Sequence, residues 1–378
     1  MSVVIDTVKA IGLTAPPAEP FGYSQEWVTE RTSTLVRIEA SDGTVGWGEC
    51  WGPIAGTRET ITDFFTPQLE GEDPLAVERI YEDLYEASRA AYMSTIPLPA
   101  ISGIDIALWD LRGKLLNQSI ADLLGGRRRD AVRAYATGHY FKHGHALEEQ
   151  YDRIAAEAAD NAAEFGAVKA KIGLELLGYG HEADIELVRR IRDAIGPDVA
   201  LFVDANYAYD TATARTVGRA LEDMNIGFFE EPVRPQNVDG YVHLRDTLEI
   251  PVAGGECHGP RDFERLLENN AVDIAQPDLC NVGGITAANR VAHAAAAAHV
   301  QVIPHVWGTP VALAASLQLI ATLPGDPWIE FDTSSNPLRD SLSPDPICAT
   351  DGTVQVPTGP GLGINLDSTA VDQYRVSD

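Results

Sequence analysis

The sequence predicts an α/β protein in which an α+β unit is followed by a parallel (β/α) barrel of the TIM type. Two observations favour this fold class. After about residue 128, short apolar strand patterns alternate with amphipathic helical patterns over roughly 200 residues. Before that point, strand patterns come first and helical patterns follow, which is typical of an α+β unit. Because no glycine-rich turn follows the first strand of the alternating region, a dinucleotide-binding fold is the weaker alternative.

The composition is that of a soluble protein with a large core. The chain has 378 residues, 45% of them hydrophobic, and a net charge of −28. Such an acidic chain would repel phosphates, which argues against nucleic acids and anionic membrane surfaces as partners. No stretch approaches the roughly 18 apolar residues of a membrane span, and the N-terminus does not resemble a signal peptide. Four scattered cysteines without CxxC spacing indicate reduced thiols, so we expect a cytoplasmic protein.

The N-terminal unit begins with strands and ends with helices. The β-rich segments Val3–Ile5 and Thr34–Ile38 predict strands, and Ser41-Asp42-Gly43 predicts a hairpin turn between strands. From residue 59 to 124 apolar residues recur with helical spacing. The clearest apolar stripe consists of Ile104, Leu108, Leu111 and Leu115. We therefore expect an α+β domain over residues 1–127.

The alternating region, residues 128–332, predicts the barrel. Its eight strand candidates are Val132–Ala136, Val168–Ile172, Ala200–Val203, Gly227–Phe229, Pro251–Ala253, Val272–Ala275, Val300–Ile303 and Pro327–Ile329. The helical patterns between them include Leu147–Glu164, Ala183–Ala194, Thr211–Met224 and Thr286–Ala298. A tail rich in Pro and Gly follows, and we expect these residues, 333–378, to return to the N-terminal unit.

The second strand of the barrel carries two lysines on one face. In Val168–Gly173, Lys169 and Lys171 are separated by one residue, and side chains alternate along a strand. Two ammonium groups side by side on a buried face should each lower the pKa of the other. A lysine with a pKa lowered toward neutrality can act as a general base. A strand end with two solvated cations is the alternative, although the whole chain has only five lysines.

Polar residues mark the ends of the second to the eighth strand, where the active site of a barrel lies. They are Lys171, Asp204, Glu230, Glu256, Asp278, His305 and Glu330. Successive members lie 33, 26, 26, 22, 27 and 25 residues apart, each about one strand-and-helix unit. Asp204, Glu230 and Glu256 would bring three negative charges together, which requires a cation. Ligands that are all carboxylate oxygens favour Mg²⁺ or Mn²⁺ over zinc.

The motifs at these strand ends resemble those of the enolase superfamily, in its mandelate racemase subgroup. They are Lys169-Ala-Lys171, Val203-Asp-Ala-Asn206, Glu230-Glu-Pro232, Gly254-Gly-Glu256, Gln276-Pro-Asp278 and Pro304-His305. The likeness runs through nearly the whole chain and includes the helix pattern Ser102–Asp110. It implies a modified (β/α)7β TIM-like barrel and an N-terminal capping domain that carries the substrate-specificity loops and is completed by the C-terminal tail. We also expect a homo-oligomer.

The resemblance implies roles for the metal ligands and the two lysines. Asp204, Glu230 and Glu256 would bind Mg²⁺, which would hold a carboxylate of the substrate. Lys171 would remove the proton α to that carboxylate. Lys169 would lower the pKa of Lys171 and touch the carboxylate.

The remaining residues would complete the site around the substrate. Glu330 and the metal would stabilise the enediolate, and His305 would act from the opposite face with Asp278 holding its tautomer. The candidates for contacts with substrate are Asn206, His139, Tyr23 and Trp51. Tyr23 and Trp51 belong to loops that would form a lid and choose the substrate. Related cycloisomerases tend to have a small residue where this chain has His139.

Several longer strings are similar to galactarolactone cycloisomerases, which remove the α-proton and expel the ring oxygen of a lactone. They are Gly46-Trp-Gly-Glu49, Arg133–Gly138, Gln276–Cys280, Pro304–Gly308, Glu330-Phe-Asp332 and Gly359–Gly363. Branches with a second catalytic lysine, such as muconate-lactonising enzymes, are excluded because no lysine follows Lys171. The substrate is thus expected to be a small sugar acid or its lactone. Acid-sugar dehydratases and racemases remain alternatives that His305 would suit equally, and an inactive barrel is the alternative from another class.

The acidic excess, with arginine preferred over lysine, indicates a surface adapted to a high-salt cytoplasm. We expect the melting temperature to rise as KCl is raised from about 0.1 M to about 1 M, because the Debye length falls from about 10 Å to about 3 Å and self-repulsion is screened. Thermal unfolding followed by circular dichroism at each salt concentration checks this. Greatest stability in low salt would contradict the hypothesis.

Overall fold

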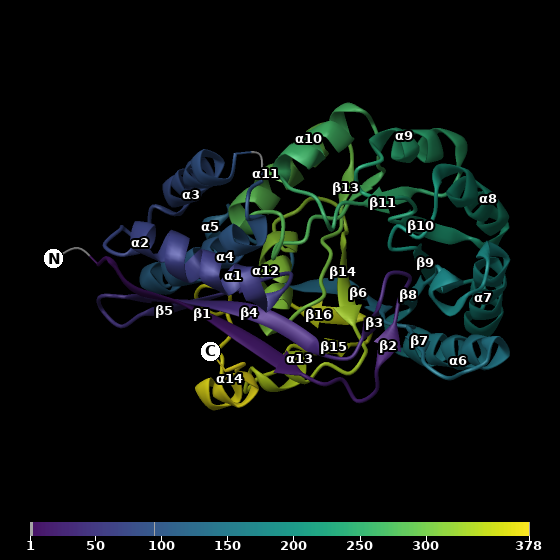
Figure 1. Ribbon diagram of the computed structural model, residues 1–378, viewed down its shortest axis with the longest axis horizontal. Helices are drawn as coiled ribbons and strands as arrows, with labels where there is room; N and C mark the ends of the chain where they lie inside the picture. Colours follow the sequence, from purple (N-terminus) through teal and green to yellow (C-terminus); the bar gives the residue numbers. More distant parts are fainter. Residues whose placement is uncertain (1–2, 94, 378) are drawn as a thin grey trace.

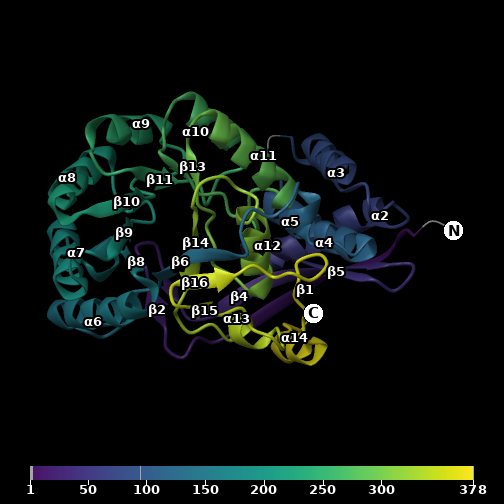
Figure 2. The ribbon, with the colours of Figure 1, turned by 180° about the vertical axis from the view of Figure 1, so that it is seen from behind.

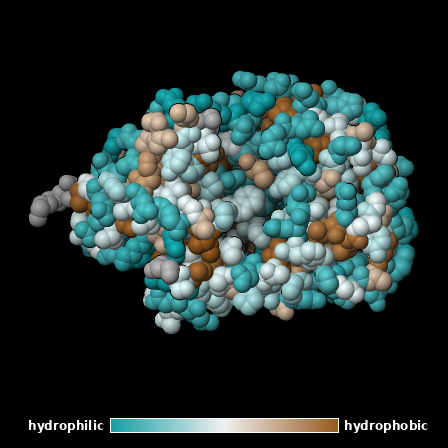
Figure 3. Space-filling model, in the orientation of Figure 1, coloured by the Kyte–Doolittle hydropathy of each residue, from teal (hydrophilic) through white to brown (hydrophobic). Residues whose placement is uncertain are grey.

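The structure, a computed structural model, describes residues 3–93 and 95–377 and has two lobes that lie side by side (Figures 1 and 2). The cap, on the left in Figure 1, is built mainly from the first third of the chain, and the barrel occupies the centre and right. The visible surface is mostly hydrophilic (Figure 3), as expected from a net charge of −28. Of the helices in the described ranges, none combines the length and apolar character that crossing a membrane requires.

The core of the cap is an antiparallel sheet. Its strands, in the order in which they pair, are β1 (Ile5–Ala15), β4 (Arg31–Ala40) and β5 (Val45–Cys50). The β4–β5 hairpin turns at the predicted Ser41-Asp42-Gly43, where the amide of Gly43 donates to the carbonyl of Ala40 at 2.8 Å. The helices that follow are α1 (Ile54–Glu59), the π-helix η1 (Thr60–Phe65), α2 (Thr66–Leu69), α3 (Val77–Tyr92), α4 (Leu98–Leu116) and α5 (Ile120–Leu123).

Helix α4 lies between the cap sheet and the barrel. The sequence predicted an apolar stripe on one face, but all residues from 100 to 111 are buried, because α4 packs against β5 on one side and α11 (Gly284–Ala297) on another. The close approach to β5 depends on Gly48: a Cβ atom there would lie 1.9 Å from the carbonyl oxygen of Gly103 in α4. The helix therefore rests directly on the backbone of the strand.

The barrel has the (β/α)7β order that the resemblance implied. Its parallel strands, in the order in which they pair, are β14 (Trp328–Asp332), β6 (Ala131–Thr137), β8 (Ala167–Lys171), β9 (Ala200–Asp204), β10 (Ile226–Glu230), β11 (Val252–Gly254), β12 (Ile274–Ala275) and β13 (Gln301–Val302). Each overlaps one of the predicted strands. The connecting helices, besides α11, are α6 (Leu147–Phe165), η2 (Leu174–Leu177), α7 (His181–Ile195), α8 (Thr211–Leu221), η3 (Glu222–Met224), α9 (Val238–Thr247), α10 (Pro260–Glu268) and α12 (Pro310–Ile320).

The interior of the barrel is filled by side chains and carries no channel. Phe202 and Phe228 stack with ring centroids 4.1 Å apart, and Tyr135 packs edge-on to both rings. The buried cluster to which they belong draws one residue from each of seven strands or strand ends around the barrel. This apolar plug leaves the strand ends as the place for polar side chains.

Two further pairings connect the lobes. Strand β2 (Phe21–Gly22) of the cap pairs with β3 (Trp27–Val28) on one side and with β7 (Phe141–Lys142) of the first barrel loop on the other. We call the segment from β2 to β3, residues 21–28, the lid. The tail contributes α13 (Pro337–Ser341), β15 (Ala349–Thr350), β16 (Thr353–Gln355) and α14 (Ser368–Tyr374). Part of the tail joins the barrel, because β16 pairs with β6. The end of the tail returns to the cap, where the Val376 amide donates to the Gly12 carbonyl at 2.9 Å.

Replacing Gly48 with alanine should destabilise the protein by about 2–4 kcal/mol, because the new methyl group would press on backbone that cannot rotate away. Denaturant unfolding checks the difference. Gly180→Ala is the matched control: φ is −81° there, and a Cβ atom would meet only the flexible end of Glu182. We expect the control to change stability by less than about 1 kcal/mol. Equal effects of the two substitutions would contradict the packing argument.

Candidate active site

The register of the parallel strands places the predicted site residues side by side. Lys171 on β8 pairs in register with Asp204 on β9, and Asp204 pairs with Glu230 on β10. Glu256 follows β11, and Glu330 lies on β14. Because the strands run in the same direction, their carboxyl ends meet on one rim of the barrel. All five side chains are buried there.

Three carboxylates on this rim form a candidate metal centre. Asp204, Glu230 and Glu256 each place one oxygen within 4.8 Å of the others. Asn206 adds a fourth oxygen: its backbone N–H donates to Asp204 Oδ1 at 2.8 Å, and its side-chain Oδ1 is buried without a hydrogen-bond partner. A divalent cation that prefers oxygen ligands would supply the charge and the partner that these atoms lack. The residues present therefore fit Mg²⁺ or Mn²⁺.

The two lysines are held by the same carboxylates. Lys169 Nζ lies 2.6 Å from both Glu230 Oε1 and Glu330 Oε1, and Lys171 forms an ion pair with Asp204. Burial lowers the pKa of both lysines, but the carboxylates of Glu230 and Glu330, and of Asp204, raise it above the ordinary value. Lys169 does lower the pKa of Lys171, but the predicted net shift toward neutrality is wrong for this arrangement, because attraction to the carboxylates outweighs burial and the repulsion between the ammonium groups. Burial raises the pKa of Glu230, and the charge of Lys169 lowers it.

His305 follows β13 and pairs with Asp278 at the neighbouring strand end. Its Nδ1 lies 2.6 Å from Asp278 Oδ2, and its Nε2 lies 3.3 Å from Glu256 Oε2. Trp51 of the cap stacks on the imidazole with centroids 5.3 Å apart. Burial lowers the pKa of His305, but Glu256, Glu330 and Asp278 raise it to about 10. The imidazole is therefore protonated at neutral pH and can donate a proton.

A cavity of about 90 Å³ opens onto this cluster. Its lining residues are Tyr23, Glu26, Trp51, Tyr140, Lys171, Asn206, Tyr207, Glu256, His305, Trp307 and Glu330. Seven of them are predicted site residues: Tyr23, Trp51, Lys171, Asn206, Glu256, His305 and Glu330. Lys169, Asp204 and Asp278 lie behind the lining and contact residues that form it. Glu230, deeper still, is reached through Lys169.

The structure places His139 away from the cavity. The ring is fully buried, with Nδ1 2.8 Å from the carbonyl oxygen of Lys169 and Nε2 3.1 Å from Asn161 Nδ2. Both ring nitrogens are occupied by the protein, so its position does not support the predicted contact with substrate. The ring instead braces the strand that carries Lys169.

Sequence reasoning missed four residues of the lining, namely Glu26, Tyr140, Tyr207 and Trp307. Trp307 lies inside one of the quoted strings, and each of the other three stands within three residues of a predicted site residue. That proximity was the available signal. Tyr207 shows what was overlooked: its hydroxyl donates to Glu256 Oε1 at 2.7 Å. Gln276 was quoted only as part of a motif, yet its Nε2 donates to Glu230 Oε2 at 2.6 Å. Both residues hold a carboxylate of the candidate metal centre in place.

The lid is tied to the loop that follows β9. Ser24 Oγ donates to the carbonyl of Ala205 at 2.7 Å, and Gln25 Nε2 donates to the carbonyl of Asn206 at 2.7 Å. The backbone of that loop is strained, because Asn206 and Tyr207 have φ values of 41° and 59°. Side chains of the cap thus hold the unusual loop conformation that presents Asn206 to the carboxylates.

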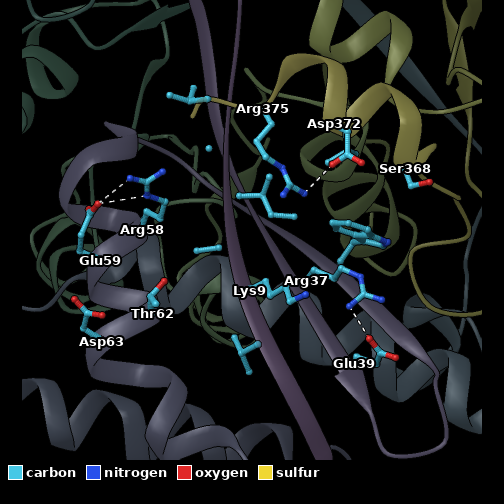
Figure 4. Close-up of a pocket in the computed structure, with 17 residues that line it drawn as sticks. Lys9, Arg37, Glu39, Arg58, Glu59, Thr62, Asp63, Ser368, Asp372 and Arg375 are labelled. Carbon is cyan, nitrogen blue, oxygen red and sulfur yellow. Dashed lines mark hydrogen bonds and ion pairs between the residues drawn. The ribbon is translucent and has the colours of Figure 1, made fainter. Parts of the chain in front are cut away.

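A larger groove, of about 780 Å³, lies on the outer side of the cap sheet (Figure 4). Six of its charged residues form three ion pairs at 2.7, 3.3 and 2.9 Å, namely Arg37–Glu39, Arg58–Glu59 and Arg375–Asp372. None of its lining residues is a histidine, and no carboxylate triad lies in it. Chemistry and not volume therefore identifies the smaller cavity as the candidate active site among the described residues.

Comparisons with known proteins agree with this assignment. A family model described as "Enolase C-terminal domain-like" matches residues 153–370, and one described as "Mandelate racemase / muconate lactonizing enzyme, N-terminal domain" matches residues 7–125. The chain is 42% identical over 372 residues to D-galactarolactone cycloisomerase from Agrobacterium fabrum, covering 95% of each chain.

Solved structures give the same picture. The 3,6-anhydro-D-galactonate cycloisomerase from Zobellia galactanivorans is 36% identical with a TM-score of 0.89, covering 99% of this chain and 100% of that one. The L-talarate/galactarate dehydratase from Salmonella typhimurium LT2, solved with Mg and L-lyxarohydroxamate, is 29% identical with a TM-score of 0.86, covering 100% of this chain and 94% of that one.

Replacing Glu256 with glutamine should weaken Mg²⁺ binding at least about tenfold, because one of three anionic ligands is lost. Calorimetric titration of Mg²⁺ in the absence of any sugar acid measures this directly. Glu264→Gln, an exposed position on α10, makes the same change of charge away from the site and should leave the affinity unchanged. Unaltered Mg²⁺ binding by the Glu256 variant would show that the triad does not bind the metal.

Proposed function

Because the chain belongs to the enolase superfamily, in the mandelate racemase / muconate lactonizing enzyme group, we propose that it is a Mg²⁺-dependent enzyme acting on a sugar acid or its lactone. The reaction we favour begins with loss of the proton α to a carboxylate and ends with opening of a lactone. The similarity to a galactarolactone cycloisomerase supports this choice.

One observation carries the proposal: a lysine, a histidine and a carboxylate line one small cavity. Lys171, His305 and Glu256 all face it, and two further carboxylates lie directly behind. A substrate carboxylate drawn toward this centre would place its α-carbon between a base and an acid. The chemistry of the site therefore matches abstraction of a proton next to a carboxylate.

Bound Mg²⁺ would supply positive charge beside the substrate carboxylate and neutralise the acids that now hold the lysines protonated. Lys171 would then lose the attraction of Asp204 and Glu256, whereas burial and the charge of Lys169 would continue to lower its pKa against a smaller opposing effect of Tyr140. Released in this way, Lys171 can accept a proton. The sequence suggested that Lys171 is the base. It would take that role only when the carboxylates are engaged elsewhere.

In the first step Lys171 Nζ takes the α-proton, and the electrons of the C–H bond form the carbon–carbon double bond of an enediolate. Lys169 supplies positive charge close to the developing negative charge. Burial raises the pKa of Glu330, but Lys169 and His305 lower it below the ordinary value, so Glu330 stays ionised. Glu330 Oε1 lies 2.6 Å from Lys169 Nζ. We therefore propose that Glu330 keeps Lys169 protonated.

In the second step the enediolate collapses, and the carbon–oxygen bond at the β-carbon breaks with its electron pair. The ring oxygen leaves as part of a carboxylate, which needs no acid. The enol that results becomes a ketone when His305 adds a proton to the β-carbon and the enol O–H proton is released to solvent. The uncharged forms of substrate and product contain the same atoms, so the overall reaction is an isomerisation.

Dehydration of an acid sugar is the second candidate, and the pairing of His305 with Asp278 favours it, because His305 Nδ1 lies 2.6 Å from Asp278 Oδ2. Hydroxide is a poor leaving group, and an imidazolium held in this way can protonate it as it departs. A racemase would instead use His305 to return a proton to the α-carbon. All three reactions share the first step, so product identity separates them.

The test is exchange of the α-proton in D₂O with Mg²⁺, across a panel of aldonates, aldarates and their lactones. Wild-type protein should exchange the α-proton of at least one member, and Lys171→Ala should lose this activity by about a thousandfold or more, because the base is absent. NMR of the products then distinguishes lactone opening, dehydration and racemisation.

Lys9→Ala is the control, because Lys9 lies on the outer cap groove and the substitution removes one lysine without touching the site. This variant should exchange at the wild-type rate. Mg²⁺ binding without exchange on any acid or lactone would favour a catalytically inactive barrel.

A further inference from the structure

The cavity has positive charge only at its barrel end. Of the residues that line it, Lys171 and His305 can be cationic, and both stand at barrel strand ends. Each is already paired with a carboxylate, Lys171 with Asp204 and His305 with Asp278. The reacting carboxylate of a substrate therefore finds its positive partners at this end alone.

The cap side of the cavity presents a negative charge, Glu26. This residue lies in the turn between β2 and β3, where the amide of Tyr23 donates to its carbonyl at 3.2 Å and the hydroxyl of Tyr23 donates to its Oε1 at 3.1 Å. The other cap residues of the lining, Tyr23 and Trp51, are aromatic. Glu26 is thus the one acidic side chain that the lid contributes to the described lining.

The cations near the lid are engaged elsewhere. Arg31 Nη2 lies 3.0 Å from Asp332 Oδ2, and its guanidinium group stacks 4.5 Å from the ring centroid of Trp307. Lys142 Nζ lies 3.3 Å from Glu19 Oε2. Neither cation lines the cavity. A second carboxylate at the far end of a substrate would face Glu26 with no cation to pair with.

We propose that Glu26 selects substrates that carry a single negative charge, namely aldonates and aldarate lactones, over doubly charged aldarates. The inference rests on the function proposed above. Hydroxyl groups at the far end of a singly charged substrate can donate to the Glu26 carboxylate, with the ring or chain against the aromatic side chains. A second carboxylate can only accept hydrogen bonds, and it is repelled.

Family membership leaves this question open. One relative is named for an anhydro-galactonate, which has one carboxylate, and another for talarate and galactarate, which have two. The choice for this chain therefore has to come from its own lid.

The test compares substrates that share a carbon skeleton but differ by one charge: galactarate with galactonate and with galactaro-1,4-lactone, and glucarate with gluconate. Rates of α-proton exchange and calorimetric affinities are measured with Mg²⁺ for wild type and Glu26→Gln. We expect wild type to prefer the singly charged member of each pair. The preference should fall about tenfold in Glu26→Gln, mainly through tighter binding of the aldarate.

Two variants separate the charge of Glu26 from other effects. Glu30→Gln removes the same charge from an exposed position that does not line the cavity, and it should keep the wild-type preference. Tyr23→Phe removes the hydrogen bond to Glu26 but leaves the carboxylate, and it should also keep the preference.

The outcomes distinguish this inference from the proposed function. Suppose that a sugar acid exchanges its α-proton. If aldarates then bind as well as their singly charged counterparts, or if the preference does not respond to Glu26→Gln, the role of Glu26 is overturned and the proposed function stands. A charge preference that Glu30→Gln weakens as much as Glu26→Gln also overturns that role, because the effect would then belong to the net charge of this part of the cap. Absence of both binding and exchange for every member overturns the proposed function and this inference together.

Discussion

The structure depends on keeping a dense group of charges buried at one end of the barrel. Lys169 lies between Glu230 and Glu330, Lys171 lies beside Asp204, and all five side chains have almost no contact with solvent. Charges can be buried only when each has a close partner, and removing one partner leaves a charge whose burial costs several kcal/mol. The parallel strands meet this requirement because their register brings opposite charges to neighbouring positions. The same compensation makes the site responsive to a cation, since any new positive charge changes which partners each acid keeps.

Much of the barrel and of its charged rim could be predicted because both follow from local periodicity. Strand alternation puts Lys169 and Lys171 on one face, and the repeat of about 25 residues returns Asp204, Glu230 and Glu256 to the same rim. What could not be predicted depends on distant contacts. The raised pKa of the lysines comes from carboxylates on other strands.

The misplaced and missed residues have the same origin in tertiary structure. His139 turns away from the cavity to contact the carbonyl of Lys169 and Asn161, and nothing in its own segment indicates that choice. Glu26 reaches the cavity only because a cap strand pairs with the first barrel loop through β2 and β7. Helix α4 was predicted with one apolar face, yet it is buried on all sides because two lobes close over it.

The pairing of β6 with β14 bears on how the chain folds. The first and last strands of the barrel meet in register, and the final turn of the tail bonds back to β1 through Val376 and Gly12. Neither lobe is therefore complete until nearly the whole chain has left the ribosome. Such long-range closure slows folding and leaves partly built intermediates exposed. Lys169 pairs with Glu230 on β10 and with Glu330 on β14, so the charge balance of the rim is complete only when the last barrel strand has joined the first.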